Sequence, residues 1–212
     1  MPSSSQNLLL KYFQQHPSLS YRKKENVLRS EDTPQGIFFI LNGYVKMNVT
    51  YPSGRELTVN IFKPSTYFPM MWALGDIPNN YDFQAMTPVL IHRSPKNEFL
   101  NFLGHNPNLL ADLTRRAYIG LDGLITHISR LLTEDAYHRI IAALVMCSKR
   151  FGRKYSRNRI FIDLPLTHQD LADLAGVTRE TASLTLEKLK QQKLINQESR
   201  HYIILKPGLL FP

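Results

Sequence analysis

The sequence has 212 residues, 43% of them hydrophobic, and a single cysteine, Cys147. A chain of this length can bury a core without cross-links. One cysteine excludes an intramolecular disulfide and any zinc or iron–sulfur site held only by cysteines of one chain. No apolar run approaches the roughly 20 residues that span a bilayer, and no stretch has the pattern of a signal peptide. We therefore expect a cytoplasmic protein that does not associate with a membrane.

The positive charge is concentrated in the C-terminal third. The formal net charge of the chain is +9; residues 138–212 carry 13 Lys/Arg and 6 Asp/Glu, a net of +7, and residues 1–137 carry 13 and 11, a net of +2. This asymmetry favours a polyanionic partner for the C-terminal third, although a solvated basic surface is an equally common explanation.

The N-terminal half reads as a short helix followed by strands. A polar start and a helix are predicted within residues 1–20, and short strands broken by turns extend from about 21 to 91. Asn42-Gly43 separates the apolar run 37–41 from the alternating run 44–49, which predicts a hairpin. Pro52-Ser53-Gly54 predicts a second turn before a strand at 57–62. Many short strands with regular turns indicate an antiparallel roll or barrel.

Helical periodicity begins near Pro95, and a long helix is predicted to start around Pro107, where proline suits a first helical position. A heptad-like seam follows. It consists of Leu110, Leu113, Ala117, Leu124 and Leu131. The seam predicts pairing with the same helix of a second chain; the alternative is a helix that lies on its own domain.

Asp135 is well suited to cap a new helix, so we place a domain boundary just before it. The predicted organisation is a domain at 1–106, a dimerisation helix at 107–132 and a further domain at 133–212. Within the last domain, residues 149–159 contain six cations, among them Arg153 and Lys154. This segment is either a solvated loop or an edge that faces phosphates.

Two short helices joined by a glycine are predicted next. Thr167 would cap a helix ending at Ala175, Gly176 would provide the turn, and Thr178 would cap a second helix. The buried face of the second helix would consist of Ala182, Leu186 and Leu189. This arrangement is typical of a helix-turn-helix motif.

The run LTHQDLADLAGVTRETASLTLEKLKQQKLI resembles the DNA-binding motif of the CRP/FNR family of bacterial transcription regulators. QGIFFILNGYVKMN resembles the hairpin of the family's β-roll, and residues 200–204 resemble a strand of its wing. The resemblance implies an α+β fold: an N-terminal antiparallel β-roll of the cyclic-nucleotide-binding type, a long dimerisation helix and a C-terminal winged helix-turn-helix. It further implies a homodimer that regulates transcription by binding an inverted repeat in double-stranded DNA, with RNA polymerase as a second partner.

The resemblance also assigns roles to residues near the motif. It implies that Arg179, Glu180 and Ser183 read bases, Arg179 by pairing with guanine and Glu180 by accepting from a cytosine amine. Phosphate contacts are expected from His168, Gln169, Thr178 and Thr181, and from Arg153 and Lys154 of the basic segment. Leu184 departs from the family, where an arginine is common. It either faces a thymine methyl group or turns inward.

Other departures concern the effector. The family's cyclic-AMP cassette needs Gly-Glu and then Arg-Ser; here no arginine occurs between Tyr67 and Ile91, and Arg93-Ser94 comes too late. We therefore expect neither cyclic AMP nor an iron–sulfur cluster, no metal, and an effector of unknown identity. His92 and His127 have the residue type of haem ligands, but a structural role is the simpler interpretation. The aromatic stretch 67–83 is either a core or a pocket for an apolar ligand.

Two other classes of protein compete with this interpretation. A cupin-like enzyme would need a histidine–carboxylate metal site, and the predicted strands offer His92 alone. A ligand-binding β-roll protein could also carry a helix-turn-helix that does not bind DNA. The sequence indicates no catalytic residues, and we expect a protein that is not an enzyme.

Overall fold

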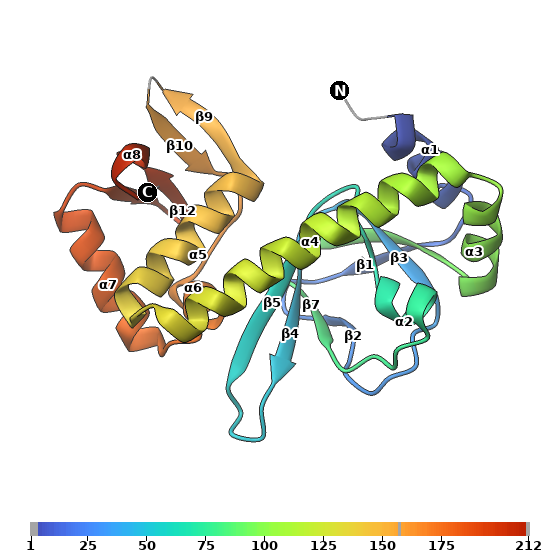
Figure 1. Cartoon of the computed structure of the whole chain (residues 1–212), viewed down its shortest axis with the longest axis horizontal. Helices are drawn as coiled ribbons and strands as arrows, with labels where there is room; N and C mark the ends of the chain where they lie inside the picture. Colours follow the sequence, from blue (N-terminus) through green and yellow to red (C-terminus); the bar gives the residue numbers. More distant parts are fainter. Residues whose placement is uncertain (1–3, 157, 211–212) are drawn as a thin grey trace. The chain divides into compact units, whose positions relative to one another are not determined.

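The computed structural model describes residues 4–156 and 158–210 (Figure 1). The contacts divide the chain into two compact units. The N-terminal unit contains the described residues up to Arg55 together with Val59–Leu124, and the C-terminal unit contains Glu56–Thr58 and the described residues from Ile125 onward. The predicted fold class is confirmed: antiparallel sheets are followed by a long helix and a C-terminal helix-turn-helix with a wing.

The N-terminal unit holds two four-stranded sheets, ordered β1-β8-β3-β6 and β2-β7-β4-β5. The strands of the first sheet are β1 (Ser18–Tyr21), β8 (Val89–Ser94), β3 (Ile37–Asn42) and β6 (Tyr67–Phe68). Those of the second are β2 (Asn26–Leu28), β7 (Asp82–Ala85), β4 (Val45–Thr50) and β5 (Glu56–Phe62). The turn predicted at residues 52–54 joins two neighbouring strands, β4 and β5.

The hairpin predicted at Asn42-Gly43 is wrong, because β3 and β4 lie in different sheets. β3 pairs with β8 and β4 pairs with β7, so two bent chain segments run antiparallel through both sheets. Gly43 has a φ of +86°, and a Cβ there would lie 2.3 Å from the carbonyl oxygen of Pro88. Asn-Gly therefore marks a tight corner between sheets, which needs the same positive φ as a hairpin turn.

Aromatic rings fill the space between the two sheets. The rings of Phe68 and Phe83 are stacked with centroids 4.6 Å apart, and Phe62 packs against both. Phe68 and Phe83 belong to the buried core of the roll. For these two residues the structure favours the core interpretation of the aromatic stretch.

A second core lies outside the roll, under the helices of the N-terminal unit. These are α1 (Ser4–Phe13), α2 (Met70–Gly75), α3 (Lys96–Gly104) and the first turns of α4 (Pro107–Thr133). Leu9 and Phe13 of α1 are completely buried, and the Phe13 ring stacks on Phe39 of β3 with centroids 4.8 Å apart. Leu109 and Leu113 fix the start of α4 to this core.

The predicted seam of α4 needs correction. Leu113 is only 4% exposed and belongs to the chain's own core, so it is not available to a partner. Leu124 and Leu131 are half-buried, whereas Leu110 and Ala117 are exposed. The predicted seam therefore does not lie on one uniformly exposed face of α4.

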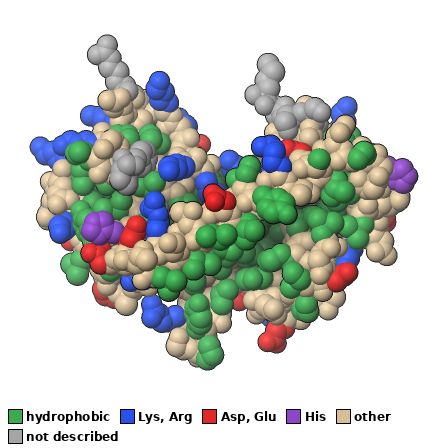
Figure 2. Space-filling view, viewed as in Figure 1, with side chains coloured by type: hydrophobic (Ala, Val, Ile, Leu, Met, Phe, Trp, Pro, Cys, Tyr) green, Lys and Arg blue, Asp and Glu red, His purple; other side chains and the backbone are tan. Residues whose placement is uncertain are grey.

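A different apolar stripe on α4 is exposed. We define the α4 stripe as the side chains that follow one another in steps of three and four residues along this face; they are Tyr118, Leu121, Ile125, Ile128 and Leu132. Figure 2 shows hydrophobic side chains gathered along this helix. These side chains lie on one face of the helix, because residues three and four apart in sequence are neighbours on a helix surface.

The C-terminal unit packs α5 (Ala136–Phe151) against α6 (His168–Ala175), α7 (Arg179–Gln191) and a four-stranded sheet. The sheet order is β11 (Ile195–Glu198), β12 (His201–Ile204), β10 (Arg159–Ile162) and β9 (Gly152–Ser156), and α8 (Pro207–Leu210) follows. Asp135 caps α5 as predicted, since its carboxylate accepts from the backbone N–H of His138 at 2.8 Å. Cys147 of α5 is completely buried, and burial raises the pKa of its thiol to about 12.

Within the part of the chain that the structure describes, no helix is long and apolar enough to cross a membrane.

Candidate nucleic-acid interface

The first helix of the motif, α6, begins at a reciprocal cap. The Thr167 hydroxyl accepts from the backbone N–H of Asp170 at 3.1 Å, and the Asp170 carboxylate accepts from the backbone N–H of Thr167 at 2.8 Å. Two N–H groups that lack partners within the helix are thereby satisfied. The predicted cap is confirmed, and it fixes the direction in which the first turn of α6 points.

The turn between the helices depends on Gly176, which ends α6 in the left-handed conformation with φ +60°. A Cβ at Gly176 would meet its nearest neighbour at 3.4 Å, which is ordinary contact. The requirement for glycine is therefore conformational and not steric. Ala172 is completely buried where the helices approach, as its small side chain predicts.

The second helix, α7, separates its residues into a buried and an exposed face. Thr178 caps it by accepting from the backbone N–H of Thr181 at 3.2 Å. The predicted buried residues are all completely buried; they are Ala182, Leu186 and Leu189. Arg179, Glu180 and Leu184 are exposed on the first two turns. The N-terminal half of α7 thus offers a cation, a carboxylate and an apolar group to a partner.

Glu180 is held in its charged form at the N-terminus of α7. A hydrogen bond from its own backbone N–H and then one from the Thr178 hydroxyl hold the pKa of its carboxyl below the ordinary value. The free N–H groups and the dipole of a helix N-terminus favour negative charge. Glu180 is therefore an acceptor only, which suits a cytosine amine and not the acceptor atoms of guanine.

The structure brings together two residues for which the resemblance implied different roles. Nδ1 of His168, a predicted phosphate contact, lies 2.8 Å from Oγ of Ser183, a predicted base reader. Both side chains are half-buried between α6 and α7. The two side chains are therefore hydrogen-bonded to each other and form one unit.

The remaining predicted phosphate contacts of the motif lie at the starts of the helices. Gln169 is exposed, and its Nε2 donates to Oδ1 of Asp173 at 2.7 Å. The hydroxyl oxygens of Thr178 and Thr181 lie 3.0 Å apart. Thr178 is exposed and Thr181 half-buried, so both hydroxyls lie where the backbone N–H groups of α7 begin.

Arg153 and Lys154 are exposed on β9, not on a loop. In Figure 1 the β9–β10 hairpin leaves the C-terminal unit at the end away from α6 and α7. The Arg153 guanidinium lies 4.5 Å from the centroid of the Phe161 ring and its Nε lies 3.7 Å from a carboxylate oxygen of Asp163. The basic segment therefore stands apart from the motif; Arg157, one of its cations, lies outside the described residues.

A cation that was not predicted to contact DNA lies closer to the motif. The turn between β11 and β12 is joined to the segment that enters α6, because the carbonyl of Arg200 accepts from the backbone N–H of Leu166 at 2.7 Å. Arg200 is exposed at this turn. Its position in the predicted wing strand was the available signal, but its proximity to α6 depends on contacts distant in sequence.

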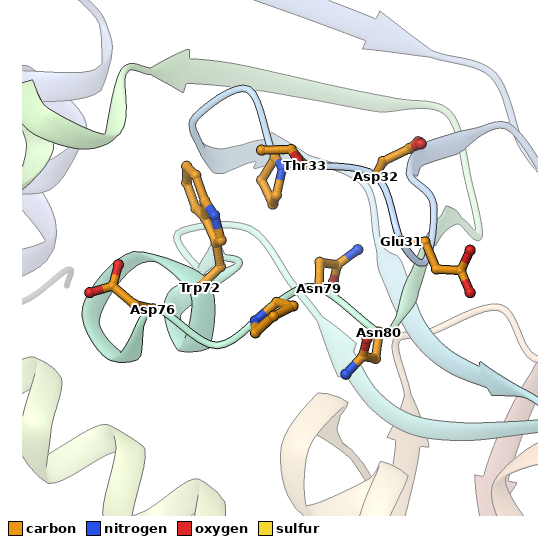
Figure 3. Close-up of a pocket in the computed structure, with 9 residues that line it drawn as sticks. Glu31, Asp32, Thr33, Trp72, Asp76, Asn79 and Asn80 are labelled. Carbon is orange, nitrogen blue, oxygen red and sulfur yellow. The ribbon is translucent and has the colours of Figure 1, made fainter.

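The N-terminal unit contains a cleft of about 420 Å³ (Figure 3). Trp72 of α2 and Asp76, the residue that ends this helix, line one side, and the loop with Glu31 and Asp32 lines another. Asp76 is paired with Lys96, whose Nζ also lies 4.8 Å from the centroid of the Trp72 ring. Three carboxylates around one opening disfavour a phosphate ligand.

Stacked rings occupy the interior of the roll, and Nη1 of Arg93 donates to Oε1 of Gln35 at 2.7 Å. Of the two histidines that have the residue type of haem ligands, His92 has a structural partner, since its Nδ1 lies 2.8 Å from the carbonyl oxygen of His16. Burial lowers the pKa of His127. Among the described residues, no cluster of three or more His, Cys, Asp or Glu side chains is arranged to hold a metal ion.

Comparisons with known proteins agree with this architecture. Residues 18–106 match the family model of the cyclic nucleotide-binding domain, and residues 138–210 match that of the Crp-like helix-turn-helix domain. The global nitrogen regulator of Nostoc sp. is 27% identical over 197 residues, which cover 90% of this chain and 86% of that protein. The nitrogen fixation regulation protein FixK of Bradyrhizobium diazoefficiens is 26% identical over 171 residues, which cover 81% of this chain and 70% of that protein.

Solved structures share the fold over nearly the whole chain. A mutant of CooA from Carboxydothermus hydrogenoformans gives a TM-score of 0.78 at 22% identity and covers 94% of this chain and 88% of that chain. FixK2 from Bradyrhizobium japonicum gives a TM-score of 0.77 at 18% identity and covers 92% of this chain and 95% of that chain. With both family models in this order, the chain belongs to the CRP/FNR family of DNA-binding transcription regulators.

Proposed function

We propose that this regulator binds an inverted repeat in double-stranded DNA as a homodimer, and that it acts in the cytoplasm with RNA polymerase as a second partner. The observation that carries the proposal is the exposed first half of α7, where Arg179 and Glu180 follow the Thr178 cap. A helix that only packs in a core has no use for an exposed cation and an exposed carboxylate beside its cap.

The roles of individual residues are part of this proposal. Arg179 donates to guanine and Glu180 accepts from cytosine. Ser183, which is hydrogen-bonded to His168, contacts a base edge. Gln169, Thr178 and Thr181 hold phosphates, as does the imidazole of His168 when a phosphate approaches it. Arg153 and Lys154 add a long-range attraction for phosphates. Arg200 joins this set, because its backbone is bonded to the entry of α6.

The homodimer follows from the α4 stripe. An apolar strip of this length on an exposed helix face is stabilised by contact with a like surface. A twofold dimer would hold two copies of α7 about 34 Å apart, which is the spacing of successive major grooves. We propose the functional division accordingly: a sensory roll at residues 1–106, a dimerisation helix at 107–132 and a DNA-binding domain at 133–212.

We infer that the effector is a signal other than cyclic AMP. The packed roll interior and the acidic cleft both disfavour a cyclic phosphate. Cyclic AMP should therefore leave both the melting temperature and the affinity for DNA unchanged, and a saturable thermal shift would contradict this inference.

The proposal is tested by selecting binding sites from random duplex DNA. An inverted repeat with two chains bound per site is the expected result, measured by electrophoretic mobility shift and mass photometry. The variant with Arg179→Ala and Glu180→Ala is the control: it should keep salt-dependent binding to any duplex and lose the selected preference. Failure to enrich any sequence, or one chain on a single half-site, would contradict the proposal.

A further inference from the structure

Leu184 is the one large apolar side chain on the exposed face of the first two turns of α7, and it is 69% exposed. It does not turn inward, since the buried face of the helix is formed by other residues, such as Ala182 and Leu186. The sequence left both orientations open. The structure assigns the outward one.

The neighbours of Leu184 are the residues proposed to read bases. Glu180 precedes it by four residues and therefore lies on the same side of the helix. Ser183, directly before it, is tied to His168. An apolar group among these polar ones would contact whatever lies between them in a major groove.

A leucine cannot donate or accept a hydrogen bond, so it distinguishes base edges by shape and polarity alone. In the major groove only thymine presents a methyl group; the other bases present donors or acceptors at the corresponding edge. Leucine against those polar atoms would leave them without partners, which is unfavourable. Contact with a thymine methyl group buries apolar surface on both sides.

We propose that Leu184 is a specificity-determining residue that reads the 5-methyl group of a thymine in each half-site. The inference rests on the proposed function and adds the identity of one base. Leu184 lies about 6 Å along the helix axis from Glu180, and stacked bases are about 3.4 Å apart. The thymine therefore lies one or two base pairs from the pair that Glu180 reads.

The test uses the full-length protein and the DNA site selected above. Each thymine is replaced in turn, symmetrically in both half-sites, by deoxyuridine, which lacks only the methyl group. One position should respond, with binding about fourfold weaker per half-site and about 15-fold weaker for the dimer, because a buried methyl group contributes about 0.8 kcal/mol. Leu184→Ala should remove the response at that position and leave the other thymines without a response, as in the wild-type protein.

Glu187→Ala is the matched control, since Glu187 is exposed on the next turn of α7. This variant should retain the deoxyuridine response of the wild-type protein. Specific binding without any responsive thymine would overturn the inference alone, as would an equal response in Leu184→Ala. Absence of specific binding by the wild-type protein would overturn the proposed function, and this inference with it.

Discussion

Ile125 lies in the middle of the α4 stripe and is 59% exposed. Full burial of an isoleucine side chain contributes about 1.5–3 kcal/mol, so covering this exposed fraction contributes about 1–1.5 kcal/mol per chain. A twofold dimer contains two such side chains. Ile125→Ala should therefore weaken self-association by about 2–3 kcal/mol, or roughly 30- to 150-fold in Kd.

Sedimentation equilibrium over a range of protein concentrations measures this Kd directly. Thr126→Ala is the matched control, because Thr126 is also exposed but lies 100° further round the helix. Its Kd should change less than about threefold, and both variants should keep the wild-type circular dichroism spectrum. An Ile125→Ala protein with the wild-type Kd, or equal losses in both variants, would refute the assignment of the stripe to the dimer interface.

Leu113→Ala tests whether Leu113 belongs to the chain's own core or to the dimer interface. Since Leu113 is part of the chain's own core, truncation should lower the free energy of unfolding by about 2–5 kcal/mol. The melting temperature should fall, and the Kd of the folded protein should change little. Loss of self-association at full stability would instead return Leu113 to the dimer interface.

Three further predictions concern the DNA-binding unit. Arg179→Ala should reduce the binding free energy by about 1–3 kcal/mol at one base position and relax the base preference there. Arg153→Ala should instead lower the affinity for all DNA sequences alike and flatten the salt dependence of binding. An equal loss of affinity for every sequence in Arg179→Ala would make Arg179 a phosphate contact. Thr167→Ala removes a reciprocal cap and should lower the free energy of unfolding by about 1 kcal/mol in urea titrations, and an unchanged midpoint would contradict the role of the cap. Burial raises the pKa of the Cys147 thiol from 9.0 to about 12, so the unfolded chain ionises first and stability is lost as pH rises from 9 toward 12. The wild-type free energy of unfolding should fall between pH 8 and pH 10 by about 1 kcal/mol more than that of Cys147→Ala, and parallel curves for the two proteins would contradict this.

Features set by neighbouring residues were predictable from the sequence. The caps at Asp135, Thr167 and Thr178 each need one side chain and a backbone N–H three residues away, and all three are present. The turn at Gly176 likewise depends on a single backbone conformation. Local chemistry of this kind is the same in any fold.

Features set by distant contacts were not predictable. The heptad series suggested that Leu113 faces a partner, but α1 and α3 cover that side of α4. The bond between His168 and Ser183 joins different helices, and the proximity of Arg200 to α6 depends on the wing turn. Periodicity shows which residues share a face, and it does not show what covers the face.

The corner at Asn42-Gly43 has a consequence for how the N-terminal unit folds. The same two chain segments supply the β3–β8 pair of one sheet and the β4–β7 pair of the other. When one of these strand pairs forms, the strands of the other pair are brought close together. The entropy cost of closing the long loop between β4 and β7 is therefore incurred only once for both sheets. The sheets should therefore form and open in a single step, and the amide protons of β3 and β4 should exchange with a common opening free energy.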